Sequence, residues 1–108
     1  MTVSAALTWC PFPDGETARA VAAQLLSEKL IACANILPEV ESIFEWEGAP
    51  STTKEVAVMF KTTADLLDKL IVRLGELHPY DTPAIAGWRC DSAHPATLKW
   101  LGDTLGAA

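Results

Sequence analysis

The sequence is poor in basic residues, in cysteine and in long apolar runs, and each shortage excludes a class of protein. Eight Lys and Arg stand against 14 Asp and Glu, so the formal net charge is −6. Such a chain repels nucleic acid and anionic membranes. No apolar run approaches the length that spans a bilayer, and no basic residue precedes the apolar start of the chain. We therefore expect a cytoplasmic protein with neither nucleic acid nor a membrane as partner.

Cysteine is scarce, and its spacing argues against a disulfide framework. Cys10, Cys33 and Cys90 are odd in number and far apart, without a CxxC arrangement. Common catalytic patterns are missing too, since the sequence holds no GxSxG, HExxH, P-loop or GxGxxG motif. We expect a protein that is not an enzyme and that needs no organic cofactor. A hydrolase or transferase with Cys33 or Cys10 as nucleophile beside His78 stays open as a further hypothesis.

Apolar residues are abundant, at 50% of the chain, and four of them are tryptophans. A length of 108 residues fits one domain, 1–108, with its own core. Four indole rings are hard to bury in a core of this size, so another subunit should bury some of them. Composition alone thus predicts an oligomer.

Apolar periodicity predicts the order of the secondary-structure elements. Alternation with period two is typical of strands, and apolar residues at i, i+3, i+4 and i+7 are typical of amphipathic helices. The predicted elements are a strand over 3–10, a helix from Asp14 to about Lys29, an extended segment over 33–46, a strand over 55–62, a helix from about 62–65 to His78, a strand over 84–90 and a last helix from Pro95. This βαββαβ order with a short C-terminal helix predicts an α+β, ferredoxin-like sandwich on an antiparallel sheet.

Local signals place several of these boundaries. The carboxylate of Asp14 is expected to cap the first helix, and Pro95 suits the first turn of the last one. Thr62 and Asp65 have the spacing of a capping box before the second helix. Pro38 cannot donate a hydrogen bond in a strand ladder, which predicts a bulge or an edge position there.

Cys33 and His78 are candidates for a metal site. Cys33 lies at the start of an extended segment, and thiolate is a strong ligand of Cu(I) and Zn(II), although a small buried hydrophobic residue is the alternative. His78 ends a helix before a segment in which two prolines hold Tyr80 and Asp81, giving a rigid cluster of imidazole, phenol and carboxylate. The alternative for His78 is a cationic ring that complements the helix C-terminus.

The segment over 39–47 has two unlike faces. One parity carries Glu39, Glu41, Glu45 and Glu47. These carboxylates either line a site for a hard cation such as Ca²⁺ or Mg²⁺, or form a solvated face paired across strands with Lys54 and Lys61. The opposite parity carries Val40, Ser42, Phe44 and Trp46. An intersubunit contact would explain that apolar face.

Four motifs stand in order along nearly the whole chain. They are Cys33-Ala34-Asn35-Ile36-Leu37-Pro38, Phe44-Glu45-Trp46-Glu47-Gly48, Lys61-Thr62-Thr63 and Leu77-His78-Pro79-Tyr80-Asp81-Thr82-Pro83. Together they resemble the CutA divalent-cation tolerance family. The resemblance implies a ferredoxin-like protomer in a homotrimer that is similar in architecture to the PII signalling proteins.

The resemblance also implies functional residues. It places metal candidates at Cys33 and His78, and it places Glu47, Lys61 and Tyr80 near a cleft between subunits. The main hypothesis is a homotrimer that responds to metal ions and binds copper or another divalent cation. The alternative is a PII-like signalling module that binds a small metabolite in the intersubunit cleft.

The sequence departs from the family pattern at two positions. Some members carry a second His where this chain has Leu77, and its absence removes one possible ligand. Members commonly carry Glu where this chain has Ala84, so a carboxylate that could complete a polar cleft is missing.

Overall fold

The computed structural model of the protein describes residues 2–106, and its elements follow the predicted order. They are β1 (Ala5–Phe12), α1 (Gly15–Ser27), β2 (Cys33–Trp46), β3 (Ala49–Thr63), a short 3-10 turn η1 (Ala64–Leu66), α2 (Leu67–Leu77), β4 (Ala86–Arg89) and α3 (Pro95–Leu105). The strands form one sheet in the order β2-β3-β1-β4, and neighbouring strands are antiparallel. This confirms the predicted α+β, ferredoxin-like fold.

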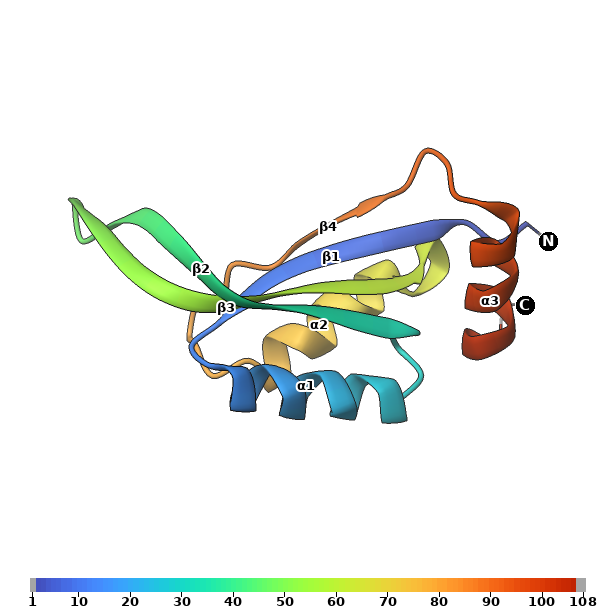
Figure 1. Cartoon of the computed structure of the whole chain (residues 1–108), viewed down its shortest axis with the longest axis horizontal. Helices are drawn as coiled ribbons and strands as arrows, with labels where there is room; N and C mark the ends of the chain where they lie inside the picture. Colours follow the sequence, from blue (N-terminus) through green and yellow to red (C-terminus); the bar gives the residue numbers. More distant parts are fainter. Residues whose placement is uncertain (1, 107–108) are drawn as a thin grey trace.

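Helices α1 and α2 both cover the same face of the sheet. Figure 1 shows α1 and α2 on the same side of the strands, whereas α3 lies at one end. Buried apolar side chains from both layers fill the space between them, including Phe12, Val58, Phe60, Leu25, Leu70 and Leu74. The rings of Phe12 and Phe60 meet edge to face with their centroids 6.4 Å apart. The core is therefore one-sided.

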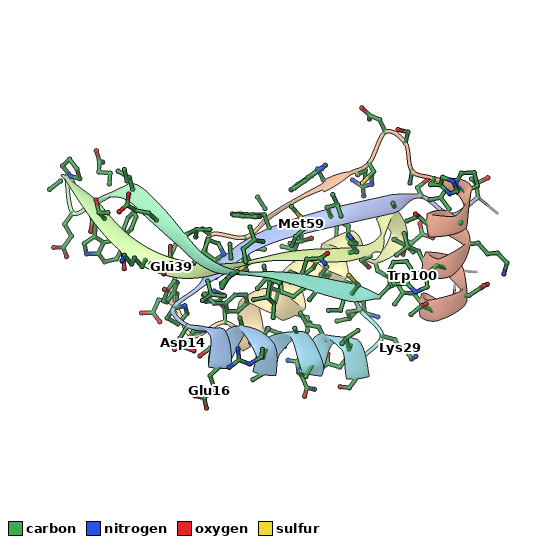
Figure 2. The ribbon with its side chains drawn as sticks, viewed as in Figure 1. Asp14, Glu16, Lys29, Glu39, Met59 and Trp100 are labelled. Atoms are coloured by element: carbon green, nitrogen blue, oxygen red, sulfur yellow. The ribbon has the colours of Figure 1, made fainter. Side chains whose placement is uncertain are left out.

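The opposite face of the sheet has no helix over it in the part of the chain that the structure describes. Strand side chains alternate, so residues between core positions of β1 and β3 point to this bare face. Trp9 and Met59 are register partners there and are only half-buried. Trp88 of β4 is 44% exposed. Figure 2 shows Met59 on the side of the sheet away from α1.

β2 and β3 extend beyond the other strands as a long hairpin (Figure 1). Trp46 pairs with Ala49, which leaves a two-residue turn of Glu47 and Gly48 with φ of 51° and 79°. Two positive φ values are typical of a type I′ turn, whose twist suits a hairpin. The register of the pair shifts once, around Pro38, which confirms the predicted bulge.

Two strands differ from the prediction, β1 by a shift of two residues and β3 by a longer N-terminal part, because their prolines lie where no neighbouring strand needs the missing N–H. β1 continues through Pro11, since β4 pairs only with residues 6–9 of this strand. β3 begins at Ala49 and includes Pro50, which pairs with β2 in the part of the hairpin that no third strand flanks. Both prolines thus occupy positions that a sheet tolerates.

One predicted helix cap is confirmed and one is wrong. Asp14 caps α1, and its Oδ1 accepts a hydrogen bond from the Thr17 backbone N–H at 2.7 Å. The capping box of Thr62 and Asp65 does not form, because Thr62 is the penultimate residue of β3. Its buried hydroxyl donates to the Leu30 carbonyl at 2.8 Å, which ties the connection between α1 and β2 to the end of β3. The 3-10 turn η1 then leads into α2.

A charged cluster joins the end of α1 to α2. Arg73 donates through Nε and Nη2 to the two carboxylate oxygens of Glu28, each at 2.8 Å, and through Nη1 to Glu76 at 3.2 Å. Hydrogen bonds from Arg73, and then from Gln24, lower the pKa of Glu28 to about 2. The bidentate geometry holds the two helices together beneath the sheet.

We predict opposite effects on stability for the same substitution at two glycines. A Cβ at Gly87 would lie 2.8 Å from Leu67 Cδ1 and 3.0 Å from the Leu7 carbonyl oxygen, so Gly87→Ala should lower the free energy of unfolding by about 1–3 kcal/mol. A Cβ at Gly75, inside α2, meets only Ile85 Cδ1 at 4.0 Å. Gly75→Ala should therefore raise stability by up to about 1 kcal/mol.

Urea denaturation of both variants at equal protein concentration measures these effects. Equal stability of Gly87→Ala and the parent protein would contradict the close packing of β4 against β1 and α2.

Candidate functional site

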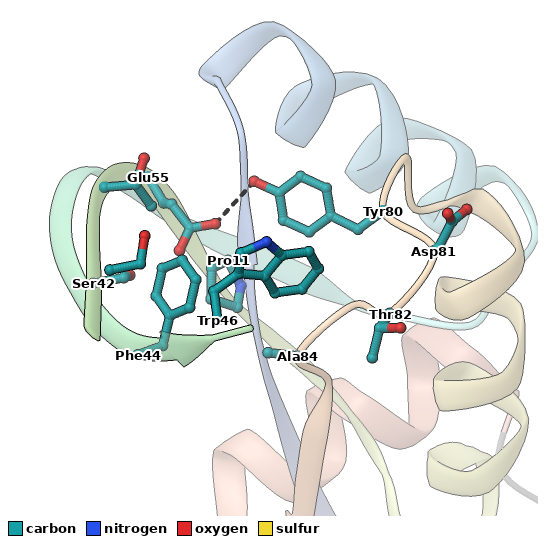
Figure 3. A pocket seen from close by; sticks show the side chains of 11 residues that line it. Pro11, Ser42, Phe44, Trp46, Glu55, Tyr80, Asp81, Thr82 and Ala84 are labelled. Atoms are coloured by element: carbon teal, nitrogen blue, oxygen red, sulfur yellow. Dashed lines mark hydrogen bonds between the residues drawn. The ribbon is translucent and has the colours of Figure 1, made fainter. Parts of the chain in front are cut away.

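A cavity of about 690 Å³ lies between the β2–β3 hairpin and the loop that joins α2 to β4. One face of the hairpin forms one wall, and the other is formed by Pro11 near the end of β1 and by the loop residues Tyr80, Asp81, Thr82 and Ala84 (Figure 3). Segments that are far apart in the sequence therefore border this half-open space.

The hairpin wall is a direct result of strand alternation. Ser42, Phe44 and Trp46 are two positions apart in β2, so all three side chains point to the cavity. Their neighbours across the hairpin continue the wall, because Ser42 pairs with Thr53 and Phe44 pairs with Ser51. The predicted apolar face of this segment is thus present, and within the single chain it faces a cavity.

A hydrogen bond between the hairpin and the loop crosses the cavity. The Tyr80 hydroxyl donates to Glu55 Oε2 at 2.9 Å (Figure 3). Glu55 is only 9% exposed, so its carboxylate is among the few buried polar groups of the sheet. Burial, followed by the hydrogen bond to Glu55 and the charge of Glu55, raises the pKa of Tyr80 to about 12. The phenol is therefore a hydrogen-bond donor at neutral pH.

His78 fastens this loop to β1. Its Nδ1 accepts a hydrogen bond from the Tyr80 backbone N–H at 3.1 Å, so the proton lies on Nε2, which donates to the Pro11 carbonyl at 2.8 Å. The imidazole stacks on the Phe12 ring with centroids 4.6 Å apart. Both ring nitrogens are engaged, and a metal ion at His78 would have to displace one of these bonds.

The cluster predicted around His78 is present in part, and one important member was missed. The rings of His78 and Tyr80 lie 4.7 Å apart, and Asp81 lines the same cavity as Tyr80. Glu55 was predicted only as the first residue of a strand. The available signal was that Glu55 directly precedes the apolar run 56–58. A carboxylate next to a buried stretch of strand is expected to have a polar partner from another segment.

Cys33 and Lys61 do not line the cavity and lie further along the sheet. They are register partners on β2 and β3, and Lys61 also pairs with Leu7, whereas the loop meets β1 at Pro11. Four residues of strand separate these positions, or about 13 Å. Lys61 alternates with the core residues of β3, so it lies on the bare face with Cys33, whereas His78 stacks on the core side. One protomer does not bring Cys33 and His78 together.

The acidic face of the hairpin is solvated, and one of its carboxylates is paired across the two strands, as the second alternative predicted. Glu39 forms an ion pair with Lys54 at 3.2 Å, and both side chains are well exposed. Glu47 lies in the turn and does not line the cavity. Within residues 2–106 no three His, Cys, Asp or Glu side chains gather closely enough to hold a metal ion.

Cys10 is unsuited to act as a nucleophile. Its side chain is fully buried in the core, and burial together with the charge of Glu55 raises its pKa to about 12. The thiol is therefore protonated near neutral pH.

The two departures from the family pattern occupy different places. Leu77 is half-buried and packs against the core. Ala84 lines the cavity, where its methyl group leaves room that a longer acidic side chain would fill.

Comparison with known proteins gives consistent matches over most of the chain. The model of a family described as CutA1 divalent ion tolerance protein matches residues 6–104. A divalent-cation tolerance protein CutA of Pyrococcus horikoshii is 45% identical over 95 residues, which are 88% of this chain and 92% of that protein. The crystal structure of CutA1 from Ehrlichia chaffeensis superposes with a TM-score of 0.91 at 33% identity, covering 97% of this chain and 98% of the other.

A further neighbour bears on the cellular compartment. A structure from Archaeoglobus fulgidus, named a periplasmic divalent cation tolerance protein CutA, has a TM-score of 0.88 at 29% identity and covers 94% of this chain and 98% of its own. None of the helices within residues 2–106 is long and apolar enough to cross a membrane.

The ionisation of Tyr80 tests the hydrogen bond across the cavity. This is the only tyrosine of the chain, so absorbance at 295 nm during an alkaline titration reports it alone. We expect a midpoint near pH 12 in place of the ordinary 10. The raised pKa favours the protonated phenol in the folded protein, so this contribution to stability is complete below pH 10 and is lost as pH rises from 10 to 12.

Glu55→Gln should lower the midpoint because the negative charge is lost, while burial keeps it above the ordinary value. Glu45→Gln, on the other face of the hairpin, should leave it unchanged. A midpoint of 10 in the folded parent protein would contradict the bond.

Proposed function

The chain belongs to the CutA1 divalent ion tolerance family, and we propose that it acts in the response to divalent metal ions as a homotrimer that binds copper or a similar cation. The observation that carries this proposal is the bare face of the sheet, which bears apolar side chains and the Cys33 thiol together. Its place in the cytoplasm and its lack of catalytic activity stay predictions.

The bare face supports association of several copies. Trp9 and Met59 lie side by side on it, and Trp88 of β4 is 44% exposed. Apolar patches of this kind on a small protein mark interaction surfaces. Three copies that pack these faces against one another would bury indole rings that one core cannot hold.

Association would also explain how the protein could bind a metal although residues 2–106 of one chain hold no cluster of ligands. Copper and zinc sites need several ligands, and the described part of one chain gathers no three candidates. Cys33 is a free, half-buried thiol on the bare face. Copies that meet there could each contribute one Cys33. His78 is the second candidate, provided that its bond to Pro11 or to Tyr80 is exchanged for the metal.

The oligomer is tested by sedimentation. The parent protein should sediment at about three times the 11.6 kDa mass of the chain. Trp9→Glu places a charge on the bare face and should yield a folded monomer. Val72→Glu, at a position of α2 that is 65% exposed, is the control and should stay trimeric. A stable, folded monomer of the parent protein at micromolar concentration would refute the proposal.

Metal binding is tested by anaerobic titration with Cu(I) against a chromogenic chelator, and with Zn(II) by calorimetry. Cys33→Ser should weaken binding at least tenfold, and His78→Gln should weaken it further if the imidazole is a ligand. Cys90→Ser alters another half-buried thiol and is the matched control. Unchanged affinity in the double variant Cys33→Ser/His78→Gln would exclude both ligands.

The cavity favours a second candidate function, that of a PII-like module which binds a small metabolite. Its volume of about 690 Å³ lies in the range of small-molecule sites. Tyr80 lines it, whereas Lys61 and Glu47 of the same chain do not and would have to come from a neighbouring copy. A ligand that binds only the folded protein raises its melting temperature.

A further inference from the structure

The cavity carries negative charge and no positive charge. Glu55 and Asp81 line it, and none of its lining residues within 2–106 is Lys, Arg or His. The adjacent Lys54 has the opposite strand parity and forms its ion pair with Glu39 on the other face of the hairpin. A cavity lined by one sign of charge attracts ligands of the other sign and repels phosphates and carboxylates.

Only one oxygen of the Glu55 carboxylate has a hydrogen-bond partner in the described part of the chain. The side chain is more than nine-tenths buried, and its Oε2 accepts the hydrogen bond from Tyr80. Its Oε1 has no hydrogen-bond partner within residues 2–106, although a carboxylate can accept about four. This oxygen is not among the buried unpaired atoms of the described residues, so it is open to the cavity, where a cationic donor has access to it.

Aromatic rings surround the carboxylate. Figure 3 shows Phe44, Trp46 and Tyr80 around the space into which Glu55 projects. Phe44 is 41% exposed and Trp46 is 62% exposed, which is unusual for large aromatic side chains unless they contact something else. The face of an aromatic ring attracts a cation within about 6 Å, and rings grouped about a carboxylate recognise ammonium groups.

We propose that this cavity binds a small organic cation, an amine or quaternary ammonium compound with an apolar body, whose charged group contacts Glu55 Oε1 among the three aromatic rings. The proposal rests on the second candidate function above and names its ligand class. The volume of about 690 Å³ lies in the size range of small-molecule sites, and this size favours a free small molecule as the ligand.

Three probes of similar size and different charge test the ligand class. Benzyltrimethylammonium is cationic, benzyl alcohol is neutral and benzoate is anionic. Each is titrated into the full-length protein at low ionic strength, and affinity is measured by the shift in melting temperature and by ligand-observed NMR. We expect binding in the order cation, neutral compound, anion, with at least a tenfold difference between the first and the last.

Matched variants locate the site. Glu55→Gln keeps the shape of the side chain and should weaken binding of benzyltrimethylammonium at least tenfold, with little effect on benzyl alcohol. Glu45→Gln removes the same charge from the opposite face of the hairpin and should leave binding unchanged. Should Glu55→Gln not fold, Trp46→Leu at the exposed end of the wall should weaken the cation by a similar factor.

The outcomes separate this proposal from the function on which it rests. If benzoate or benzyl alcohol binds as tightly as the cation, the ligand class is wrong, while the cavity remains a ligand site. If none of the probes stabilises the protein and a broad metabolite screen is also flat, both proposals fail, as they would if a neighbouring copy filled the cavity. Equal binding to the parent protein and to both Glu55→Gln and Trp46→Leu would place the cation elsewhere.

Discussion

The structure depends on the two-residue alternation of side chains along β3, which pairs with β2 on one edge and with β1 on the other. Alternation sends Val58 and Phe60 into the core beneath the sheet, and it sends Met59 and Lys61 to the bare face. Glu55 has the parity of the bare face, so it points to the cavity and away from the core. One strand thereby sets the core, the association surface and the charged wall of the cavity, and a register slip of one residue would exchange them all.

The two candidate sites, the Cys33 thiol and the cavity of Glu55 and Tyr80, lie in different environments. The Cys33 thiol lies on the bare face beside Lys61, and within residues 2–106 it belongs to no group of three candidate metal ligands. The Glu55–Tyr80 pair lies in a half-open cavity whose walls all come from one chain. His78 does not line the cavity, but its bonds to Pro11 and Tyr80 set the position of the loop that does. The family description refers to divalent ions, and it does not by itself account for a cavity lined by acidic and aromatic side chains.

Local signals in the sequence predicted the fold, and they failed where a contact came from a distant segment. Asp14 was recognised as a cap because its partner, Thr17, is three residues away. Thr62 was misassigned to a capping box because its true partner, the Leu30 carbonyl, is 32 residues away. Glu55 was overlooked for the same reason, since it meets Tyr80 across 25 residues.

The sequence by itself determined the order and type of the elements, the two unlike faces of the hairpin and the family, because periodicity, turn residues and ordered motifs are local properties. Only the tertiary structure decided that His78 fastens a loop, that Cys33 lies far from it, and that Glu55 faces Tyr80 in a cavity. These relations depend on strand register and on which face of the sheet the helices cover. Both are settled by packing between segments that are remote in the chain, which no local pattern records.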